Sequence, residues 1–381
     1  MRVCIVGIGY TPFRPTSSDV SFREMIYRAA VMAYQDAKIE PKDVSTFISV
    51  SEDFTEGTSI FDEYVPDQLG ATLKPVHTIA GCGLTAVCSA FLQIQTGMFK
   101  IAVVEGHSKA SNILNKHIVD SFALDPIYIR PLRVNPISIA ALEMNAYLNK
   151  TGLTEVHTSL IVEKNKKQGI KNALAPYGEN IDRDAVLNSE YISYPIKEKD
   201  VSLYSDGAIV VVLADESTAK SLTSEPVYIR GVGWAQDTPN IEMRDLSKAV
   251  YSEIAAQKAY RMAGIKNPKK EIDFAEIDDT YSFKEIQHIQ SVGLAQPYEI
   301  GPMIEGGYFC FSSELPVNPS GGALSCGNLY DANGLRLVVE SVLQLRGRAG
   351  ERQIKNAQTA LLCSWRGIPT ASGAVVVLSN Y

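Results

Sequence analysis

Two stretches of this chain repeat one another at a fixed spacing, and the repeat limits the folds that the chain can adopt. RAAVMAYQDAKI at 28–39 and IAAQKAYRMAGI at 254–265 share alanine, tyrosine and isoleucine positions 226 residues apart. The ends of the two halves also match, with SDGAIVVVL at 205–213 and ASGAVVVL at 371–378. Chance similarity of two amphipathic helices would not predict matching terminal strands. We therefore predict a duplicated α/β unit.

The chain has 381 residues, which is too long for one ordinary core and fits either two packed domains or one large α/β unit with an insertion. We expect an N-terminal half at 1–224 and a C-terminal half at 225–381. A segment of roughly 115–200 lacks a counterpart in the second half and is predicted to form an inserted loop domain. It is rich in Lys, Asn and Tyr, which is typical either of solvated surface or of a ligand-binding insertion. Both interpretations stay open.

Apolar, β-branched runs alternate with helical patterns along the chain, which predicts a mainly parallel sheet between layers of helices. The first strand, VCIVGIG at 3–9, ends in a Gly-x-Gly turn. A dinucleotide site would need a third glycine and a helix start next, but Thr11 and Pro12 follow. The pattern argues against nucleotide binding there.

The net charge of the chain argues against two classes of binding partner. A net charge of −7 and a pI near 5.4 predict neither nucleic acid nor an anionic membrane as partner. The sequence has no apolar run of about 18 residues and no signal-peptide pattern, so we expect a cytoplasmic protein. The six cysteines show no CxxC spacing, so we expect neither a metal site nor a disulfide framework.

Four local motifs carry a family resemblance. They are VNPSGGALSCGNLYDANGLR (317–336), IAGCGLTAV (79–87), EIDDTYSFKE (276–285) and LCSWRGIPTASGA (362–374). The first is similar to the thiolase stretch Asn-x-x-Gly-Gly, Gly-His-Pro and Gly-x-Arg, and the others resemble the nucleophile turn, the Asn-Glu-Ala-Phe motif and the C-terminal cysteine loop. With the duplicated halves, nearly the whole chain resembles the thiolase superfamily, in particular its archaeal and sterol-carrier-type acetyl-CoA acetyltransferase branch.

The resemblance implies a thiolase fold, with five αβαβα layers built from two duplicated halves and an inserted loop domain. It implies a homodimer or a dimer of dimers, a small zinc-ribbon and OB-fold partner protein, and CoA or an acyl-CoA as ligand. Thiolase chemistry needs a cysteine thiolate that takes the acyl group, an acid/base group at the α-carbon, and donors that stabilise the oxyanions.

The nucleophile turn departs from the family pattern. Alignment by its glycine and its Leu-x-Ala places Ala80 on the nucleophile and Cys82 on the following serine. A methyl group cannot attack a thioester, so Cys82 is either a displaced nucleophile at a helix N-terminus or a small buried thiol. Gly81 and Gly83, together with Gly321 and Gly322, are expected to line the ligand cleft or to form sharp bends.

The acid/base positions depart as well. Gly-His-Pro appears here as Gly-Asn-Leu, so Asn328 is a candidate oxyanion donor that cannot titrate. The companion histidine of related enzymes should fall near Asp278 and Asp279, which would act as a carboxylate base or as loop caps. Cys363 matches the proton-shuttling cysteine of the family and is either reactive or a buried structural thiol.

Two functions follow from these departures. The first is a thiolase-like protein with a degenerate site, non-catalytic or weakly active, that retains CoA or acyl-CoA binding. The alternative is an active acyl-CoA C-acyltransferase that uses Cys82 and Cys363. Candidate phosphate contacts in the basic insertion are Lys164, Lys166 and Lys167, unless they form a merely solvated face.

Overall fold

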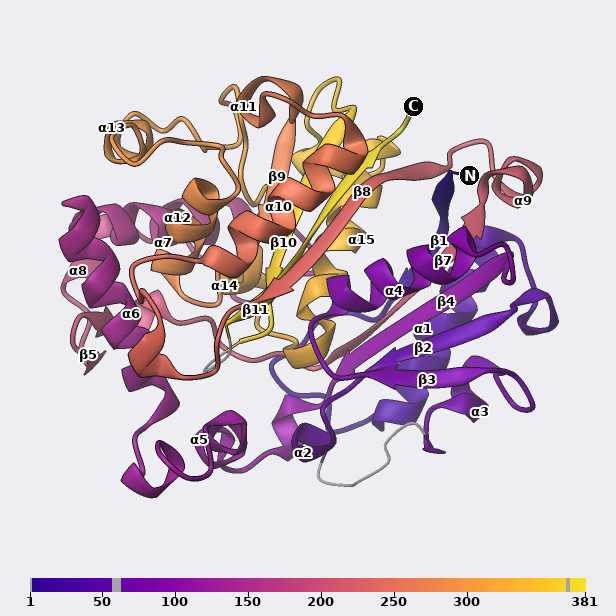
Figure 1. Ribbon diagram of the computed structural model, residues 1–381, viewed down its shortest axis with the longest axis horizontal. Helices are drawn as coiled ribbons and strands as arrows, with labels where there is room; N and C mark the ends of the chain where they lie inside the picture. Colours follow the sequence, from indigo (N-terminus) through magenta and orange to yellow (C-terminus); the bar gives the residue numbers. More distant parts are fainter. Residues whose placement is uncertain (1, 57–62, 368–370) are drawn as a thin grey trace.

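The computed structural model describes residues 2–56, 63–367 and 371–381. A sheet of nine strands runs through it in the order β3-β2-β4-β7-β1-β8-β11-β10-β9 (Figure 1). The strands are β1 (Val3–Tyr10), β2 (Thr46–Val50), β3 (Val76–Ile79), β4 (Ile101–Ser108), β7 (Gly207–Asp215), β8 (Val227–Gln236), β9 (Phe274–Ile277), β10 (Thr359–Trp365) and β11 (Ser372–Ser379).

The sheet is mixed, so the prediction of a mainly parallel sheet was wrong. Strand β7 runs antiparallel to β1 and β4, and β11 runs antiparallel to β8 and β10. Parallel pairs join β2 to β3 and β4, and β9 to β10. Strands buried on both faces are continuous apolar runs in either direction, and so their sequences do not reveal the antiparallel ones.

The strand order confirms the duplication. In the N-terminal half β7 lies between β4 and β1, and in the C-terminal half β11 lies between β10 and β8. The two halves join where β1 and β8 pair antiparallel, with Val3 opposite Ile229. The matching motifs at 205–213 and 371–378 are thus the equivalent antiparallel strands of the two halves.

Two glycine pairs fix how the first helix of each half lies on its sheet. A Cβ on Gly7 or Gly9 would stand 2.4 or 2.0 Å from carbonyl oxygens of helix α1 (Phe22–Ala37). A Cβ on Gly231 or Gly233 would stand 2.1 Å from a carbonyl oxygen of helix α10 (Val250–Ala263). The glycines that suggested a nucleotide turn therefore serve close helix packing.

Five layers pack around three apolar cores, and the central core lies on both sides of the middle layer of helices (Figure 1). Helix α1, with α3 (Pro66–Leu69) and α9 (Glu216–Leu222), covers the outer face of the N-terminal strands. Helices α4 (Gly83–Gln95) and α15 (Asn333–Leu345) fill the central layer between the two halves. Helices α10 and α12 (Ser282–Ser291) cover the outer face of the C-terminal strands. Neighbouring residues on one strand alternate between cores: Val104 points into the central core and Val103 into the outer one.

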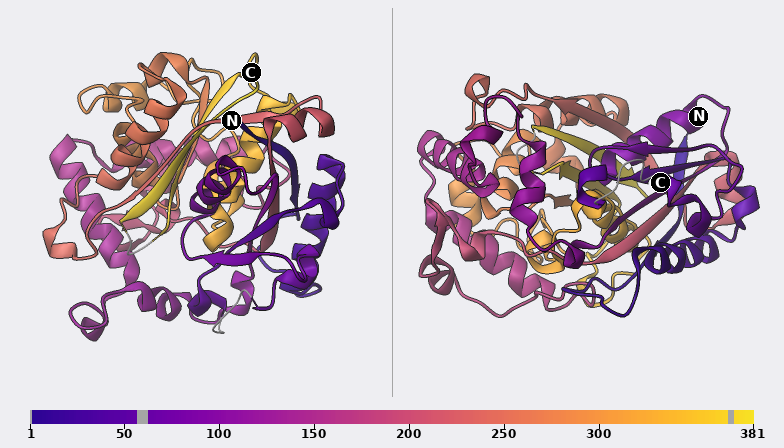
Figure 2. Two further views of the ribbon diagram at one scale, coloured as in Figure 1. Left: turned by 45° about the vertical axis from the view of Figure 1, so that its right-hand side comes forward. Right: turned by 90° about the horizontal axis from the view of Figure 1, so that it is seen from below.

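The inserted segment packs against the C-terminal half (Figures 1 and 2). It contains α5 (Lys116–Asp120), α6 (Pro136–Thr151), α7 (Glu155–Gly169), α8 (Arg183–Leu187), β5 (Tyr191–Ser193) and β6 (Ile196–Lys197). Its helix α7 lies against α12, α13 (Ile300–Glu305) and α14 (Gly322–Cys326). Two further short helices are α2 (Asp53–Glu56) and α11 (Pro268–Glu271). The boundary between residues 224 and 225 stays a prediction.

Among the residues that the structure describes, no helix is both long enough and apolar enough to cross a membrane.

Candidate functional site

A cleft of about 280 Å³ opens between the inserted segment and the loops that follow strands of both halves. Its apolar wall includes Pro136, Ile137 and Trp365. Its main polar lining is Glu52, Asp120, Tyr204, Tyr281, Asn328, Tyr330, Asp331, Asn333 and Arg366. None of the described residues that line the cleft carries a thiol.

An acid and two tyrosines form one side of the cleft. The Tyr204 hydroxyl donates a hydrogen bond to Asp120 Oδ2 at 3.1 Å, and its ring stacks on that of Tyr330 with centroids 4.8 Å apart. Burial raises the pKa of Asp120 to about 6, although the Tyr204 hydrogen bond opposes the shift. A carboxyl group that titrates there can accept and return a proton near neutral pH.

Tyr281 and Tyr330 are suited to donate hydrogen bonds. Burial raises the pKa of both hydroxyl groups above the usual value for tyrosine. They therefore stay protonated at neutral pH, and a neutral phenol can donate to a carbonyl or enolate oxygen.

Asn328 holds Tyr330 in an unusual backbone conformation. Its side-chain Oδ1 accepts a hydrogen bond from the Tyr330 N–H at 2.9 Å, and Tyr330 has a φ of 47°, in the left-handed region. A bulky residue rarely adopts this conformation, and such strain is concentrated at functional sites. Asn328 lines the cleft, and with its oxygen engaged by the backbone its side chain can still donate through the amide N–H groups; its role as an oxyanion donor stays a prediction.

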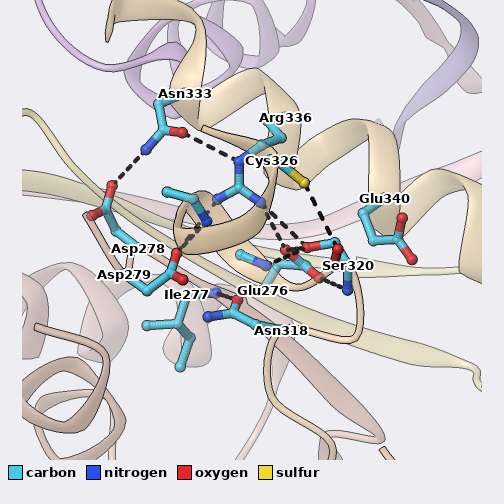
Figure 3. Close-up of polar contacts among 12 residues, drawn as sticks. Glu276, Ile277, Asp278, Asp279, Asn318, Ser320, Cys326, Asn333, Arg336 and Glu340 are labelled. Atoms are coloured by element: carbon cyan, nitrogen blue, oxygen red, sulfur yellow. Dashed lines mark hydrogen bonds and ion pairs between the residues drawn. The ribbon is translucent and has the colours of Figure 1, made fainter. Parts of the chain in front are cut away.

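Asn333 is fixed at the floor of the cleft by a buried polar network (Figure 3). Its Nδ2 donates to Asp278 Oδ2 at 3.0 Å, and its Oδ1 accepts from Arg336 Nε at 3.2 Å. Burial raises the pKa of Asp278, which also accepts from the Thr280 N–H at 3.0 Å. Asp278 thus supports the cleft from beneath and does not line it.

Arg336 lies between two buried carboxyl groups (Figure 3). Its Nη1 is 3.4 Å from Glu276 Oε2, and its Nη2 is 3.8 Å from Asp279 Oδ1. Burial raises the pKa of Glu276 to about 8 and that of Asp279 to about 7, while the guanidinium charge opposes both shifts. The network holds α15 against the loop that carries Asp278 and Asp279.

Asp279 caps a short helix. It accepts hydrogen bonds from the N–H groups of Ala323 and Leu324, at 2.5 and 3.1 Å, in the first turn of α14. A Cβ on Gly322 would stand 2.0 Å from Asp279 Oδ2, and one on Gly321 would stand 2.7 Å from the backbone of α7. The close approach that these glycines allow is to the protein itself, which agrees with the loop-cap interpretation of Asp279. That Gly321 and Gly322 line a ligand cleft stays a prediction.

The nucleophile turn does not reach the cleft. Cys82 is the residue before α4, is 4% exposed and packs in the central core, with its Sγ 3.3 Å from Thr85 Oγ1. Ala80 is exposed. A Cβ on Gly81 would meet nothing closer than 3.7 Å, whereas Gly83 lies tightly against α15.

Cys363 is buried within β10. Burial raises the pKa of its thiol to about 12, and the Sγ donates weakly to Ser252 Oγ at 3.7 Å. Its backbone carbonyl accepts from the Asp278 N–H at 2.8 Å, so the motifs at 276–285 and 362–374 do meet in space. A thiol in this environment carries almost no thiolate at neutral pH.

The three candidate lysines make contacts within the protein. Lys164 Nζ is 2.9 Å from Glu285 Oε1, and Lys166 is buried with its Nζ 3.1 Å from a backbone carbonyl. Lys167 is the most exposed of the three, and its Nζ is 2.6 Å from Glu163 Oε1. Lys164 and Lys167 line a second cavity, and none of the three lines the cleft.

Sequence reasoning missed Asp120, Tyr204, Tyr281 and Tyr330. A signal existed for two of them, because Tyr281 and Tyr330 lie inside the motifs quoted above. In the part of the chain that the structure describes, no group of three or more His, Cys, Asp or Glu side chains is arranged to hold a metal ion.

Residues 233–380 match the family described as "Thiolase C-terminal domain-like". The chain is 28% identical to the acetyl-CoA acetyltransferase of Methanothermobacter thermautotrophicus, over 94% of each chain. It is 27% identical to sterol carrier protein 2 of Bos taurus, over 94% of this chain and 69% of that one.

Two solved structures share the fold. One is described as the Ltp2-ChsH2(DUF35) aldolase, with a TM-score of 0.86, 21% identity, and coverage of 100% of this chain and 98% of that chain. The other is a monomeric SCP2-thiolase-like protein type 1 from Mycobacterium smegmatis, with a TM-score of 0.76, 17% identity, and coverage of 100% of this chain and 77% of that chain.

Proposed function

This chain belongs to the thiolase superfamily, and we propose that it binds an acyl thioester of the acyl-CoA class in the cleft without forming an acyl-cysteine intermediate. The observation that carries this proposal is the composition of the cleft. It offers hydroxyl, carboxyl and amide groups, whereas Cys82 and Cys363 are both buried away from it.

The groups that line the cleft are suited to binding a thioester but not to acyl transfer. A thioester carbonyl in the cleft would meet the Asn328 amide and the tyrosine hydroxyl groups, which are donors suited to its oxygen. Acyl transfer also needs a thiolate within about 3.5 Å of the carbonyl carbon. Burial of Cys82 and the raised pKa of Cys363 both oppose that step.

Calorimetry with CoA and acetyl-CoA, run beside a thiolysis assay and intact mass spectrometry, tests the proposal. We expect binding in the micromolar range, about −8 kcal/mol, with no acetyl adduct after incubation with acetyl-CoA or acetoacetyl-CoA. An adduct that Cys82→Ser abolishes would instead support the acyltransferase that uses Cys82 and Cys363. Absence of binding at millimolar ligand would contradict the proposal.

A second candidate function is enzymatic, and the pairing of Asp120 with Tyr204 favours it. Thiolase chemistry joins two steps, acyl transfer to a thiol and carbon–carbon bond formation through a thioester enolate. Without the thiol, only the enolate step remains, and an enolate that reacts with an aldehyde or ketone performs an aldol reaction. One solved structure of the same fold is described as an aldolase.

In the cleavage direction, a base removes the proton of a β-hydroxyl group, the bond between Cα and Cβ breaks, and the electron pair passes to the thioester enolate. A proton then returns to Cα, giving a carbonyl compound and a shortened acyl thioester. Asp120, acting through Tyr204, would take the first proton, and Tyr281, Tyr330 and Asn328 would donate to the enolate oxygen.

An aldolase assay with a panel of β-hydroxyacyl-CoA substrates, which follows release of the carbonyl compound, tests this candidate. We expect Tyr330→Phe and Asp120→Asn to lower turnover while acyl-CoA binding persists. The matched control is Tyr191→Phe, because Tyr191 is half exposed on the inserted hairpin and does not line the cleft. Activity that survives both cleft substitutions would contradict the assignment.

We also infer assembly with other chains. Strand β3 is the outermost strand of the described sheet, which supports a homodimer that pairs two N-terminal halves. The inserted segment, which contributes Asp120 and Pro136 to the cleft, also carries exposed apolar side chains, among them Ile127, Tyr128 and Leu132, and these support a small partner protein such as a zinc-ribbon and OB-fold protein. Co-purification of a tagged chain with the protein of a neighbouring gene, identified by mass spectrometry, tests this partner.

A further inference from the structure

An ion pair between the two halves of the chain lies in the lining of the cleft. Glu52 lies two residues after β2, and Arg366 is the residue after β10. Arg366 Nε donates a hydrogen bond to Glu52 Oε1 at 2.6 Å, and its Nη2 donates to the same oxygen. The Glu52 side chain is 11% exposed, and its backbone N–H donates to Asp331 Oδ2 at 2.8 Å. The guanidinium charge is thus compensated within the protein by a nearly buried carboxylate.

The described lining of the cleft carries more acidic than basic side chains. The acidic residues are Glu52, Asp120, Glu198 and Asp331, and the residues that can carry a positive charge are His117 and Arg366. Glu198 and Asp331 therefore add carboxyl groups beyond the pair that Glu52 forms with Arg366. A ligand that brought a further carboxylate into the cleft would meet this excess of like charge.

Both basic groups of the lining already face an acid. Arg366 pairs with Glu52, and His117 lies in α5 three residues before Asp120. Burial raises the pKa of Asp120, while the positive charges of His117 and Lys116 oppose that shift and so favour its carboxylate. A cation that already has a partner stabilises a second anion less than a cation without one.

The apolar wall of the cleft suits an uncharged acyl group. Ile137, Ile192 and Leu203 line it, together with Trp365. Apolar carbon atoms gain by leaving water for this wall, whereas a carboxylate that loses its water there needs a cation in compensation. Arg366 could supply that cation only by leaving Glu52 nearly buried and unpaired.

We propose that the cleft selects acyl thioesters whose acyl group carries no charge, and that Glu52 enforces this selection by holding Arg366. The inference rests on the proposed function, because it concerns the same cleft and the same acyl-CoA class of ligand. Glu52 acts here as a positioning residue, since its effect on the ligand passes through the guanidinium of Arg366.

Calorimetry with three acyl-CoA compounds of matched chain length tests the selection. Hexanoyl-CoA ends in a methyl group, adipoyl-CoA ends in a carboxylate, and the monomethyl ester of adipoyl-CoA is as long as adipoyl-CoA but uncharged. At about pH 8, Asp120 is ionised, because its pKa is about 6. We expect the unmodified chain to bind adipoyl-CoA at least about 10-fold more weakly than hexanoyl-CoA, and the methyl ester within about 3-fold of hexanoyl-CoA.

Glu52→Gln should relax this selection. It keeps the shape of the side chain and releases the guanidinium, so adipoyl-CoA should gain at least about 5-fold in affinity relative to hexanoyl-CoA. Adding Arg366→Gln to that variant should abolish the gain, because the released cation is then absent. The matched control is Glu216→Gln, which breaks an ion pair with Arg2 at α9, outside the described lining of the cleft, and should leave the affinity ratio unchanged.

The ratio of two affinities within one variant does not depend on its overall stability, and the ratios of the unmodified chain need no substitution at all. The inference is overturned if the unmodified chain binds adipoyl-CoA as tightly as hexanoyl-CoA, or if the methyl ester binds as weakly as adipoyl-CoA. It is also overturned if Glu52→Gln leaves the ratio unchanged, or if the gain persists in the double variant. These results would leave the proposed function intact, whereas binding of none of the three compounds would contradict the proposed function and this inference with it.

Discussion

Helices α4 and α15 cross at Gly83, the first residue of α4, and Gly334, in the first turn of α15. They lie so close there that neither glycine position has room for a side chain. A Cβ on Gly83 would stand 2.5 Å from the Leu335 backbone nitrogen, and a Cβ on Gly334 would stand 2.6 Å from the Leu84 backbone nitrogen. The two helices come from different halves of the chain. Their N-terminal ends meet in the central layer, which sets the position of Asn333 at the floor of the cleft.

Gly83→Ala should therefore destabilise the fold strongly. The added methyl group meets backbone atoms, which cannot rotate away, so we expect a loss of about 3 kcal/mol in the free energy of unfolding. Denaturant unfolding followed by circular dichroism measures it. Gly81→Ala, two residues earlier, is the control, because its nearest neighbour would be 3.7 Å away and its cost should stay below about 0.5 kcal/mol. Equal costs for the two variants would contradict the close crossing.

The same kind of contact shows which part of the duplication the sequence could reveal. The helices at 28–39 and 254–265 align with a spacing of 226 residues, but the glycines that receive them, Gly7 with Gly231 and Gly9 with Gly233, are 224 residues apart. A search at one fixed spacing finds the helices and misses the strands. VGIGY and RGVGW carry the missed signal, because each places two glycines where a helix backbone meets the sheet.

The cleft was harder to predict than the fold. Its Asp120, Tyr204 and Tyr330 come from three segments that meet only through tertiary packing, and Asp120 lies in the inserted segment, where no repeat guides an alignment. The family motifs did point to Asn328, which lines the cleft, but they also pointed to Cys82 and Cys363, which are buried in the protein core. Motif position identifies an element, whereas side-chain direction depends on packing that one sequence does not show.

Arg336→Met should be strongly destabilising, and more so as the pH rises. The substitution removes the guanidinium that faces the buried Glu276 and Asp279, whose pKa values are about 8 and 7 with Arg336 in place. At pH 5 both carboxyl groups are protonated with or without Arg336, so the loss is smallest there, and it grows above about pH 7, where the carboxylates form only beside the guanidinium. We expect a loss of about 3–5 kcal/mol at pH 9. Urea unfolding at pH 5, 7 and 9 measures this trend.

Glu276→Gln is the control for that prediction. The folded-state pKa of Glu276 is raised by burial to about 8, above its ordinary value of 4.5, so its contribution to stability is present below about pH 4.5 and is lost as the pH rises towards 8. The neutral amide mimics the protonated form and should cost far less than Arg336→Met at pH 9. A loss for Arg336→Met that does not depend on pH would contradict a role in charge compensation.

Asp120 should titrate near pH 6, and the hydrogen bond from Tyr204 should affect the midpoint of this titration. Burial raises the pKa of Asp120, while the hydrogen bond from Tyr204 opposes that shift, so Tyr204→Phe should move the midpoint upwards. Nearby positive charge from Lys116 and His117 also favours the carboxylate. Carbon-13 NMR of the side-chain carboxyl groups, assigned with Asp120→Asn, reports the midpoint without requiring turnover. Any aldolase activity should fall as the pH drops below about 6, and a downward shift in Tyr204→Phe would contradict the hydrogen bond.

Dimerisation should depend on the open edge of β3. The carbonyl oxygens of Pro75 and Ile79 accept hydrogen bonds from β2, from the N–H groups of Phe47 and Ser51, so the backbone groups of the intervening Thr78 point away from β2. No other described strand pairs with that edge, which is free to meet its copy in a second chain.

Thr78→Pro removes the N–H that such pairing needs, and we expect it to shift the chain from dimer to monomer in light scattering at micromolar concentration. Thr78→Val is the control: it keeps the N–H and removes a buried hydroxyl that lacks a partner, so the dimer should persist without loss of stability. A monomeric unmodified chain, or a Thr78→Pro variant that still dimerises, would place the contact between chains on another surface.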